Sequence, residues 1–307
     1  MPRRLSGSEA EIAEPANGVP TVGTRRAPGR GEIARLLRQH GLHPSKALGQ
    51  HFVTDPNTVE RIARLARVGP GDRVLEIGAG LGSLTIALAA TGALVTAVEV
   101  DHGIVPVLRQ LVEPLGVSVV EADAMSCDWA VLLAGAPHWV LVANLPYNVA
   151  TPLVLDLLRD VPSIGRMLVL VQREAGDRLV AAPGASGFGA VSVRVGYFAT
   201  ATLVGRVPPG VFLPRPNVES VLVELVRREF PAVDPAMASY AEIDLLLRAG
   251  FAGRRKMLRR SLEGLVDASV FSAAGIDGRS RAEELGIEDW GKLVACRRSI
   301  ACGHPRS

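Results

Sequence analysis

The middle of the chain alternates between short apolar runs and helix-like stretches, and this alternation limits the possible folds more than any other feature. The apolar runs cover residues 73–77, 94–99, 117–121, 139–143 and 167–171. Helical stretches such as residues 84–90 and 151–158 fall between them. Strands that alternate with helices form a largely parallel sheet with helices on both faces, so the sequence predicts an α/β fold.

Two further apolar runs, residues 191–198 and 218–226, follow with no comparable helix between them. They predict an antiparallel pair at the end of the sheet and complete a set of seven strands. Beyond residue 229 the pattern becomes helical with short breaks at glycines. We therefore expect a flexible tail over residues 1–30, a main domain over residues 31–229 and a small all-α domain over residues 230–307.

The first predicted strand runs into "EIGAGLG", a glycine-rich turn that opens a helix. Gly78 and Gly80 would let the backbone approach a ligand where side chains would collide. The next strand ends at Glu99, whose carboxylate can accept both hydroxyls of a ribose. Asp123 follows the third strand and could accept from an adenine amino group. Each feature alone has an alternative, a tight turn or a solvated or capping acid, but together they predict a nucleoside site.

The order of acid and glycines in this turn resembles the S-adenosylmethionine-dependent methyltransferases, whose cofactor is an adenosine with a short amino-acid arm. This resemblance gives the segment "NLPYN" a chemical meaning. The side-chain oxygen of Asn144 and the backbone carbonyl of Leu145 or Pro146 can accept the two hydrogens of an adenine amine. That arrangement favours a tetrahedral nitrogen with a localised lone pair, and Pro146 fixes the turn that aims the acceptors.

Tyr147, in the same segment, can stack on the base. Catalysis would then rest on placement and electrostatic stabilisation. The alternative is an ordinary strand-to-helix turn with a buried tyrosine. Phe212, in "VFLPRPNVES", could close over the opposite face of a flipped base, or be a core residue before a strand.

A basic segment lies in the predicted helical domain. On one helix, a spacing of three to four residues would place Arg255 beside Arg259 and Lys256 near Arg260, where like charges repel unless phosphates neutralise them. The segment predicts RNA-backbone binding, and a solvated helix face is the alternative. The candidate residues are Arg248, Arg254, Arg255, Lys256, Arg259 and Arg260.

Composition sets few further limits. The net charge is only +3, and the three cysteines form neither a metal-binding pattern nor a disulfide framework. Glycines and threonines interrupt the uncharged stretch over residues 77–98, so it does not predict a membrane span. The sequence thus predicts a cytoplasmic, monomeric protein with no metal and no membrane partner.

Taken together, the motifs resemble the ribosomal RNA adenine dimethyltransferases that modify adjacent adenines near the 3′ end of small-subunit rRNA. The resemblance runs from about residue 46 to about residue 295 and rests on these segments: "LGQHFVTDP", "VLEIGAGLGSLT", "AVEVD", "EADAM", "NLPYN", "FLPRPNVES", "GFAGRRKMLRRSL" and "GIDGRSRAEELGIEDW". It implies a Rossmann-like class I methyltransferase fold, with S-adenosylmethionine as cofactor and S-adenosylhomocysteine as product.

The resemblance also assigns residues. It implies cofactor contacts for His51, Val53, Gly78, Glu99, Asp123 and Asn144, with His51 and Val53 standing where many members have Asn and Leu. The "NLPY" segment would also hold the target amine. The implied activity is N6,N6-dimethylation of two adjacent adenosines on the small ribosomal subunit or its precursor. Two alternatives remain: a large-subunit rRNA methyltransferase that confers antibiotic resistance, and a nucleic-acid-binding scaffold that keeps the fold.

Overall fold

The computed structural model describes residues 26–253 and 255–303. Most of the predicted tail, residues 1–25, lies outside this part, as does Arg254. The last residues before the first helix are packed, since Ala27 is buried and Arg30 donates to the backbone oxygens of Gly210 and Phe212 at 2.8 Å. Within the described residues, no helix combines the length and apolarity that a bilayer crossing requires.

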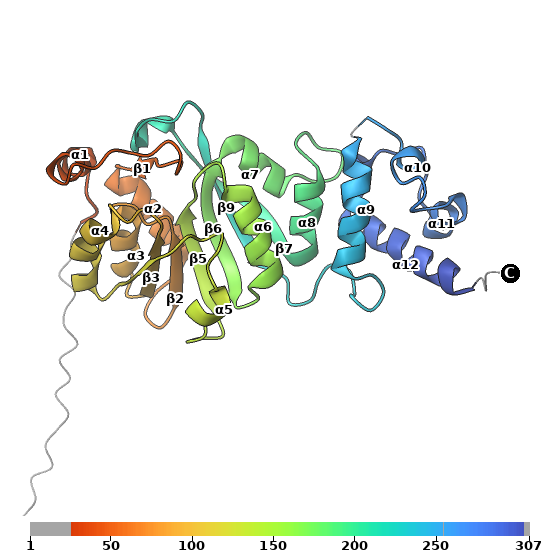
Figure 1. Ribbon diagram of the computed structural model, residues 1–307, viewed down its shortest axis with the longest axis horizontal. Coiled ribbons are helices and arrows are strands. Elements are labelled where there is room, and N and C mark those ends of the chain that lie inside the picture. Colours follow the sequence, from red (N-terminus) through yellow and green to blue (C-terminus); the bar gives the residue numbers. More distant parts are fainter. Residues whose placement is uncertain (1–25, 254, 304–307) are drawn as a thin grey trace, which may run out of the picture.

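A seven-stranded sheet forms the centre of the molecule (Figure 1). Its first five strands pair in parallel, and β9 runs antiparallel to both of its neighbours. In sheet order the strands are β4 (Ser118–Glu121), β3 (Leu94–Glu99), β2 (Arg73–Ile77), β5 (Trp139–Asn144), β6 (Ile164–Gln172), β9 (Ser220–Arg227) and β7 (Ala199–Val207). The predicted mostly parallel, seven-stranded sheet is therefore confirmed.

Helices cover both faces of this sheet and form two apolar cores with it. One core contains residues of α1 (Arg30–Gln39), α2 (Pro56–Ala66), α3 (Ser83–Ala89) and α4 (Val105–Val112). The other contains residues of α6 (Ala150–Asp160), α7 (Arg173–Val180) and α8 (Ala190–Phe198), beside the short α5 (Trp129–Leu132). Asp55 caps α2 by accepting from the backbone N–H of Thr58 at 3.0 Å.

The prediction of a strand over residues 191–198 is wrong, because this segment is helix α8. Its "VSVRV" alternation resembles a strand, but the helix lies between two cores. Val195 packs into the core beside the sheet, and Val193 and Tyr197 pack into the core of the C-terminal helices. A helix buried on opposite sides lacks a single apolar face. The strand that pairs with β9 at the edge of the sheet is instead β7, which the sequence did not predict.

A second sheet of two short strands was also not predicted. β1 (Phe52–Val53) pairs antiparallel with β8 (Phe212–Leu213), so two of the motifs quoted above meet through backbone hydrogen bonds. The pairing places the residues around His51 against the start of "FLPRPNVES".

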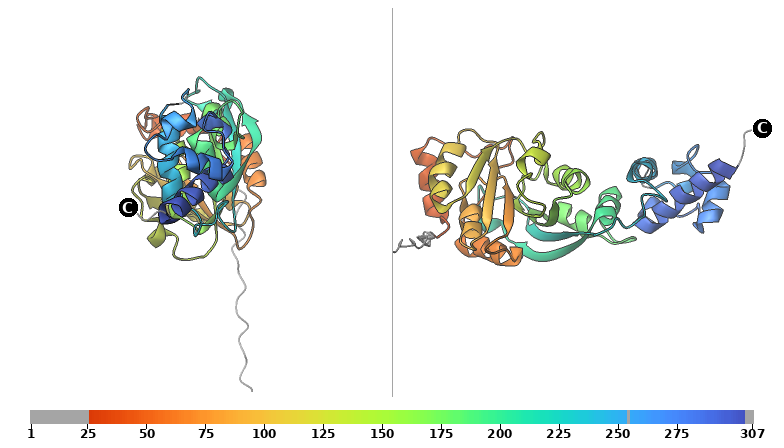
Figure 2. Two further views of the ribbon diagram at one scale, coloured as in Figure 1. Left: turned by 90° about the vertical axis from the view of Figure 1, so that its right-hand side faces the viewer. Right: turned by 90° about the horizontal axis from the view of Figure 1, so that it is seen from below.

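The C-terminal helices gather at one end of the elongated molecule (Figures 1 and 2). They are α9 (Tyr240–Ala252), α10 (Leu258–Ser261), α11 (Ala268–Ala274) and α12 (Ile287–Gly303). Their core surrounds Trp290 and also includes Phe188, from before α8. The Asp244 carboxylate joins α8 to α9, because Arg194 and Arg248 each donate to it at 2.7 Å. The domain division at residue 229 stays a prediction.

Candidate active site

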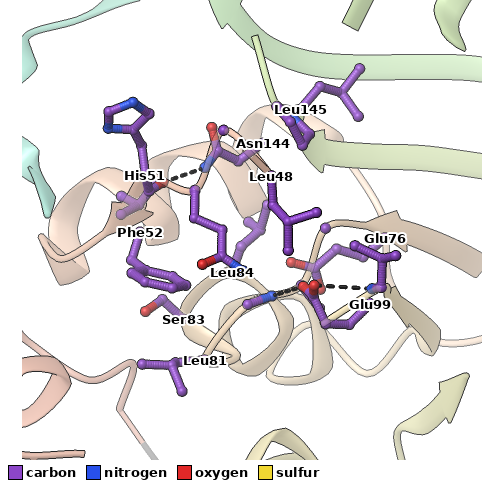
Figure 3. A pocket seen from close by; sticks show the side chains of 18 of the residues that line it. Leu48, His51, Phe52, Glu76, Leu81, Ser83, Leu84, Glu99, Asn144 and Leu145 are labelled. Atoms are coloured by element: carbon purple, nitrogen blue, oxygen red, sulfur yellow. Dashed lines mark hydrogen bonds between the residues drawn. The ribbon is translucent and has the colours of Figure 1, made fainter. Parts of the chain in front are cut away.

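Two adjoining cavities open at the carboxyl ends of β2, β3 and β5, where ligands bind in open α/β sheets. They share Leu48, Gly78, Val100 and Pro146 as lining residues, so they form one continuous trough. Figure 3 shows the first cavity, with Asn144 and His51 on one side and Glu76 and Glu99 together on another. The first cavity is lined by these predicted site residues: His51, Val53, Gly78, Gly80, Glu99, Asn144, Leu145, Pro146 and Tyr147.

The glycine-rich turn has a backbone conformation that favours glycine. Gly78 and Gly80 both have positive φ angles, 75° and 56°, which L side chains rarely adopt. A Cβ atom on Gly80 would lie 2.9 Å from the Phe52 ring. The turn can therefore pass close to β1, with Gly78 and Gly80 in the lining of the first cavity.

Glu99 is held in a fixed orientation at the end of β3. One carboxylate oxygen accepts from the Gly80 N–H at 2.7 Å, and the other accepts from the backbone N–H groups of the next two residues at 3.0 Å (Figure 3). Burial raises the pKa of the Glu99 carboxyl, and these backbone hydrogen bonds oppose the rise. Because a carboxylate can accept several hydrogen bonds, Glu99 remains able to accept from a ligand's hydroxyls.

Glu76 is a site residue that the sequence analysis left without a role. It is only 1% exposed and lines the first cavity. Among the described residues, its Oε2 is one of the few buried side-chain oxygens without a hydrogen-bond partner. Burial raises the pKa of Glu76 to about 8, and repulsion from Glu99 adds to that rise. A buried carboxyl oxygen without a partner calls for a donor, and a ligand's ammonium group would supply one.

The Glu76→Gln variant should be more stable than the parent at high pH. The folded-state pKa of about 8 lies above the ordinary value of 4.5, so the parent loses stability as pH rises between these values. The loss should amount to about 1.4 kcal/mol per pH unit. Glutamine has no proton to lose, so thermal melts should show the variant's advantage growing from pH 5 to pH 8. An advantage that is independent of pH would contradict the burial of a neutral carboxyl.

The second cavity has apolar walls with one carboxylate at its rim. Ile77, Val98 and Leu153 contribute to its lining, and Asp123 is the acid. One Asp123 oxygen accepts from the Met125 N–H at 2.9 Å, which fixes the side chain. Apolar walls with one acceptor at the rim suit a flat heterocycle that carries an amino group.

Asn144 is oriented by a backbone carbonyl. Its Nδ2 donates to the His51 oxygen at 2.9 Å, so its Oδ1 is the atom left to accept from a ligand (Figure 3). The structure also distinguishes between the backbone carbonyls of Leu145 and Pro146, the two alternatives that the sequence offered for the second acceptor. The Pro146 oxygen already accepts from the N–H groups of Val149 and Ala150 at the start of α6. Leu145 is therefore the better source of the second acceptor.

Tyr147 is fixed at both ends. Its hydroxyl lies 2.9 Å from Oγ of the buried Ser220, and its ring stacks on His51, with centroids 5.1 Å apart and an interplanar angle of 26°. His51 Nδ1 lies 2.8 Å from the Pro214 oxygen, a contact that requires a proton on Nδ1. Phe212 is fully buried in the core and lies outside the described wall of the cavity, so its stacking on a base stays a prediction.

The basic segment does not form one helix, and that part of the prediction is wrong. Helix α9 ends at Ala252 and α10 begins at Leu258, so Arg255 and Lys256 precede the helix that carries Arg259 and Arg260. The four described side chains of this segment, from Arg255, Lys256, Arg259 and Arg260, are nevertheless exposed.

The surroundings of this segment add details that the sequence did not give. Arg248 forms a salt bridge with Asp244, although its side chain remains 72% exposed. Backbone bonds from Leu258 to Ser280 and from Arg259 to Gly278 place the exposed Arg279 beside the segment, a neighbour that the sequence analysis missed.

Comparison with known proteins agrees with this geometry. Residues 42–297 match the family model described as ribosomal RNA adenine dimethylase. The ribosomal RNA small subunit methyltransferase A of Cutibacterium acnes is 44% identical over 275 residues, which cover 85% of this chain and 91% of the relative. The protein of the same name from Thermobifida fusca is 42% identical over 277 residues, 87% of this chain and 94% of the relative.

Solved structures share the fold. A dimethyladenosine transferase from Plasmodium falciparum superposes with a TM-score of 0.67 at 24% identity, covering 78% of this chain and 94% of that one. The 23S rRNA methyltransferase ErmE gives 0.63 at 25% identity, covering 80% and 99%. The fold is thus that of the class I rRNA methyltransferases, and the chain belongs to the ribosomal RNA adenine dimethylase family.

Proposed function

We propose that this protein dimethylates the N6 atoms of two adjacent adenosines near the 3′ end of small-subunit rRNA. The observation that carries the proposal is the convergence of Glu99, Asn144 and Tyr147 on one trough in a member of this family. Relatives named for the small subunit are 42–44% identical over most of the chain. The large-subunit enzyme ErmE is 25% identical, which favours the small subunit as the target.

The residues of the trough fit S-adenosylmethionine. Asp123 and the apolar second cavity would hold its adenine, Glu99 its ribose hydroxyls, and Glu76 the ammonium of its amino-acid arm. Gly78 and Gly80 allow the close approach, and His51 and Val53 complete the wall. When bound, the cofactor supplies an electrophilic methyl group on a sulfonium sulfur.

The chain's own contribution is to present the adenine nitrogen as a nucleophile. Asn144 Oδ1 and the Leu145 carbonyl would accept its two hydrogens, and Tyr147 would hold the base by stacking. These acceptors would favour a localised lone pair on N6, and that lone pair could attack the methyl group that the bound cofactor would supply. The methylated nitrogen then loses a proton to solvent, so no strong base is required. Four methyl transfers complete two dimethyladenosines.

The proposal extends to the partner. The immature small subunit would be bound in part by the exposed cations of residues 255–260, in a helical domain over residues 230–307 that acts on RNA. The protein would act as a monomer in the cytoplasm. Labelled-methyl transfer to separated, undermethylated subunits tests the assignment. Label should enter the small subunit, and label confined to the large subunit would refute it.

Replacing Arg255 and Arg259 together by Glu should weaken binding to the small subunit and flatten its salt dependence. Each lost phosphate contact should lower the slope of log affinity against log salt by roughly 0.7–0.9. Cofactor affinity should stay the same, since β2, β3 and β5, whose ends form the trough, lie away from α10 (Figure 1). Binding titrations at several salt concentrations measure the slope.

A matched control is the double replacement of Arg35 and Arg109 by Glu, on α1 and α4. These helices lie at the end of the molecule opposite α10 (Figure 1). The control has the same charge change and should keep the parental slope. If the Arg255/Arg259 variant melts at the parental temperature and keeps the parental slope, these residues do not belong to the RNA-binding surface.

A further inference from the structure

A further cleft, separate from the two cavities of the trough, opens beside the candidate active site, at the carboxyl end of β6. Its lining includes Gln172, Arg173 and Asp177 on one side and Val218 and Glu219 on the other. Gln172 is the strand partner of Ser220, whose hydroxyl holds the Tyr147 hydroxyl at 2.9 Å. The cleft therefore begins at the direct strand partner of the residue that anchors the proposed base-stacking tyrosine.

The cleft has a fixed planar cation next to an apolar surface. The Arg173 guanidinium lies 3.3 Å from Glu219 Oε2 and 3.7 Å from Asp177 Oδ2, and its backbone N–H donates to the Glu219 oxygen at 3.0 Å. Val218, on the facing wall, is 45% exposed and presents an apolar side chain beside this cation. Guanidinium planes and apolar side chains are surfaces on which unstacked RNA bases lie.

The charges of the cleft exclude one class of ligand. Glu174, Asp177 and Glu219 bring three carboxylates, against the two guanidinium groups of Arg173 and Arg178. A phosphate would be repelled by this excess of negative charge. A base with an exocyclic amine fits better, because carboxylate oxygens and the Gln172 amide oxygen accept from such amines.

The far wall of the cleft belongs to a loop that contacts the C-terminal part of the chain, which carries the basic segment. Ser186 and Gly187 line the cleft, and they belong to the loop between α7 and α8. In the same loop, the Gly184 N–H donates to the Glu283 oxygen of the C-terminal part at 2.9 Å. Helices α7 and α8 lie between β6 and the C-terminal helices (Figure 1), so an RNA strand that reaches Tyr147 from the side of α10 would pass this cleft.

We infer that this cleft holds the base of the nucleotide next to the one being methylated. For a substrate with two adjacent adenines, the occupant is the other adenine. The inference rests on the proposed function. It gives the enzyme a means of recognising the RNA sequence around the target, since contacts to flanking nucleotides set the choice of target in base-modifying enzymes.

The test combines Arg173→Gln with RNA hairpins that carry either an intact or an abasic nucleotide beside a single target adenine. With the parent protein, the abasic site should lower kcat/KM about tenfold, within what one stacked base contributes. Arg173→Gln should lower kcat/KM about tenfold on the intact hairpin and hardly at all on the abasic one. If the two losses multiply instead, the cleft does not hold this base.

Two further measurements keep the test decisive. Val218→Ala should repeat the pattern of Arg173→Gln. Arg109→Gln, which removes another half-exposed arginine, paired with Glu113 at 3.0 Å, should not. The fluorescent base 2-aminopurine, placed beside the target, should change its emission when the parent binds and not when Arg173→Gln binds. An unchanged emission with the parent would overturn the inference. Emission that changes in a protein that transfers no methyl group would contradict the proposed function alone.

Discussion

Asn144→Ala is expected to transfer methyl groups about 100-fold more slowly than the parent at saturating cofactor and RNA. Removing one preorganised polar group from an active site costs roughly 10²–10³ in rate. The lone-pair effect exists mainly in the transition state, so rate should fall further than binding. Cofactor affinity should fall by about tenfold or less, because Asn144 also ties down the His51 backbone.

Single-turnover kinetics separate the two effects. Asn57→Ala is a suitable control, since Asn57 is an exposed asparagine on α2, outside the described trough. Its rate should be parental. A folded Asn144→Ala protein that methylates at the parental rate would refute the role given to the Asn144 oxygen.

Glu99→Ala should weaken S-adenosylmethionine binding by roughly 1.5–3 kcal/mol, the range for hydrogen bonds to a charged group. This corresponds to a loss of about tenfold to over a hundredfold in affinity. The structure adds a second effect, because Glu99 accepts from three backbone N–H groups that shape the glycine-rich turn. Calorimetric titration should therefore be accompanied by a melting curve.

Glu121→Ala provides the matched control for this prediction. Glu121 lies directly opposite Glu99 in the register of β3 and β4, and it is exposed at the same edge of the sheet. Its loss should leave cofactor affinity unchanged. Unchanged affinity in a folded Glu99→Ala protein would instead exclude Glu99 from the cofactor site.

Much of this site was predictable because its residues follow strands that the sequence pattern reveals. Once a parallel sheet is inferred, residues at successive strand ends must meet at one edge. For this reason the sequence alone places Glu99, Asp123 and Asn144 at one edge of the sheet. The glycines of the turn were predictable for the same reason, and their positive φ angles agree.

The parts that could not be predicted depend on contacts between distant segments. The strand-like "VSVRV" of α8 becomes helical because two cores enclose it, and no local pattern reports a second core. The unpaired state of Glu76 depends on what surrounds it after folding. The choice between the Leu145 and Pro146 carbonyls depends on where α6 begins, and helix boundaries are poorly defined by sequence.

The most direct test of the proposed activity is mass spectrometry of the 3′-terminal rRNA fragment after reaction of the purified protein with undermethylated small subunits and S-adenosylmethionine. Our proposal predicts four added methyl groups, located as N6,N6-dimethyladenosine at two adjacent positions. An unmodified fragment, despite a folded protein that binds the cofactor, would contradict it.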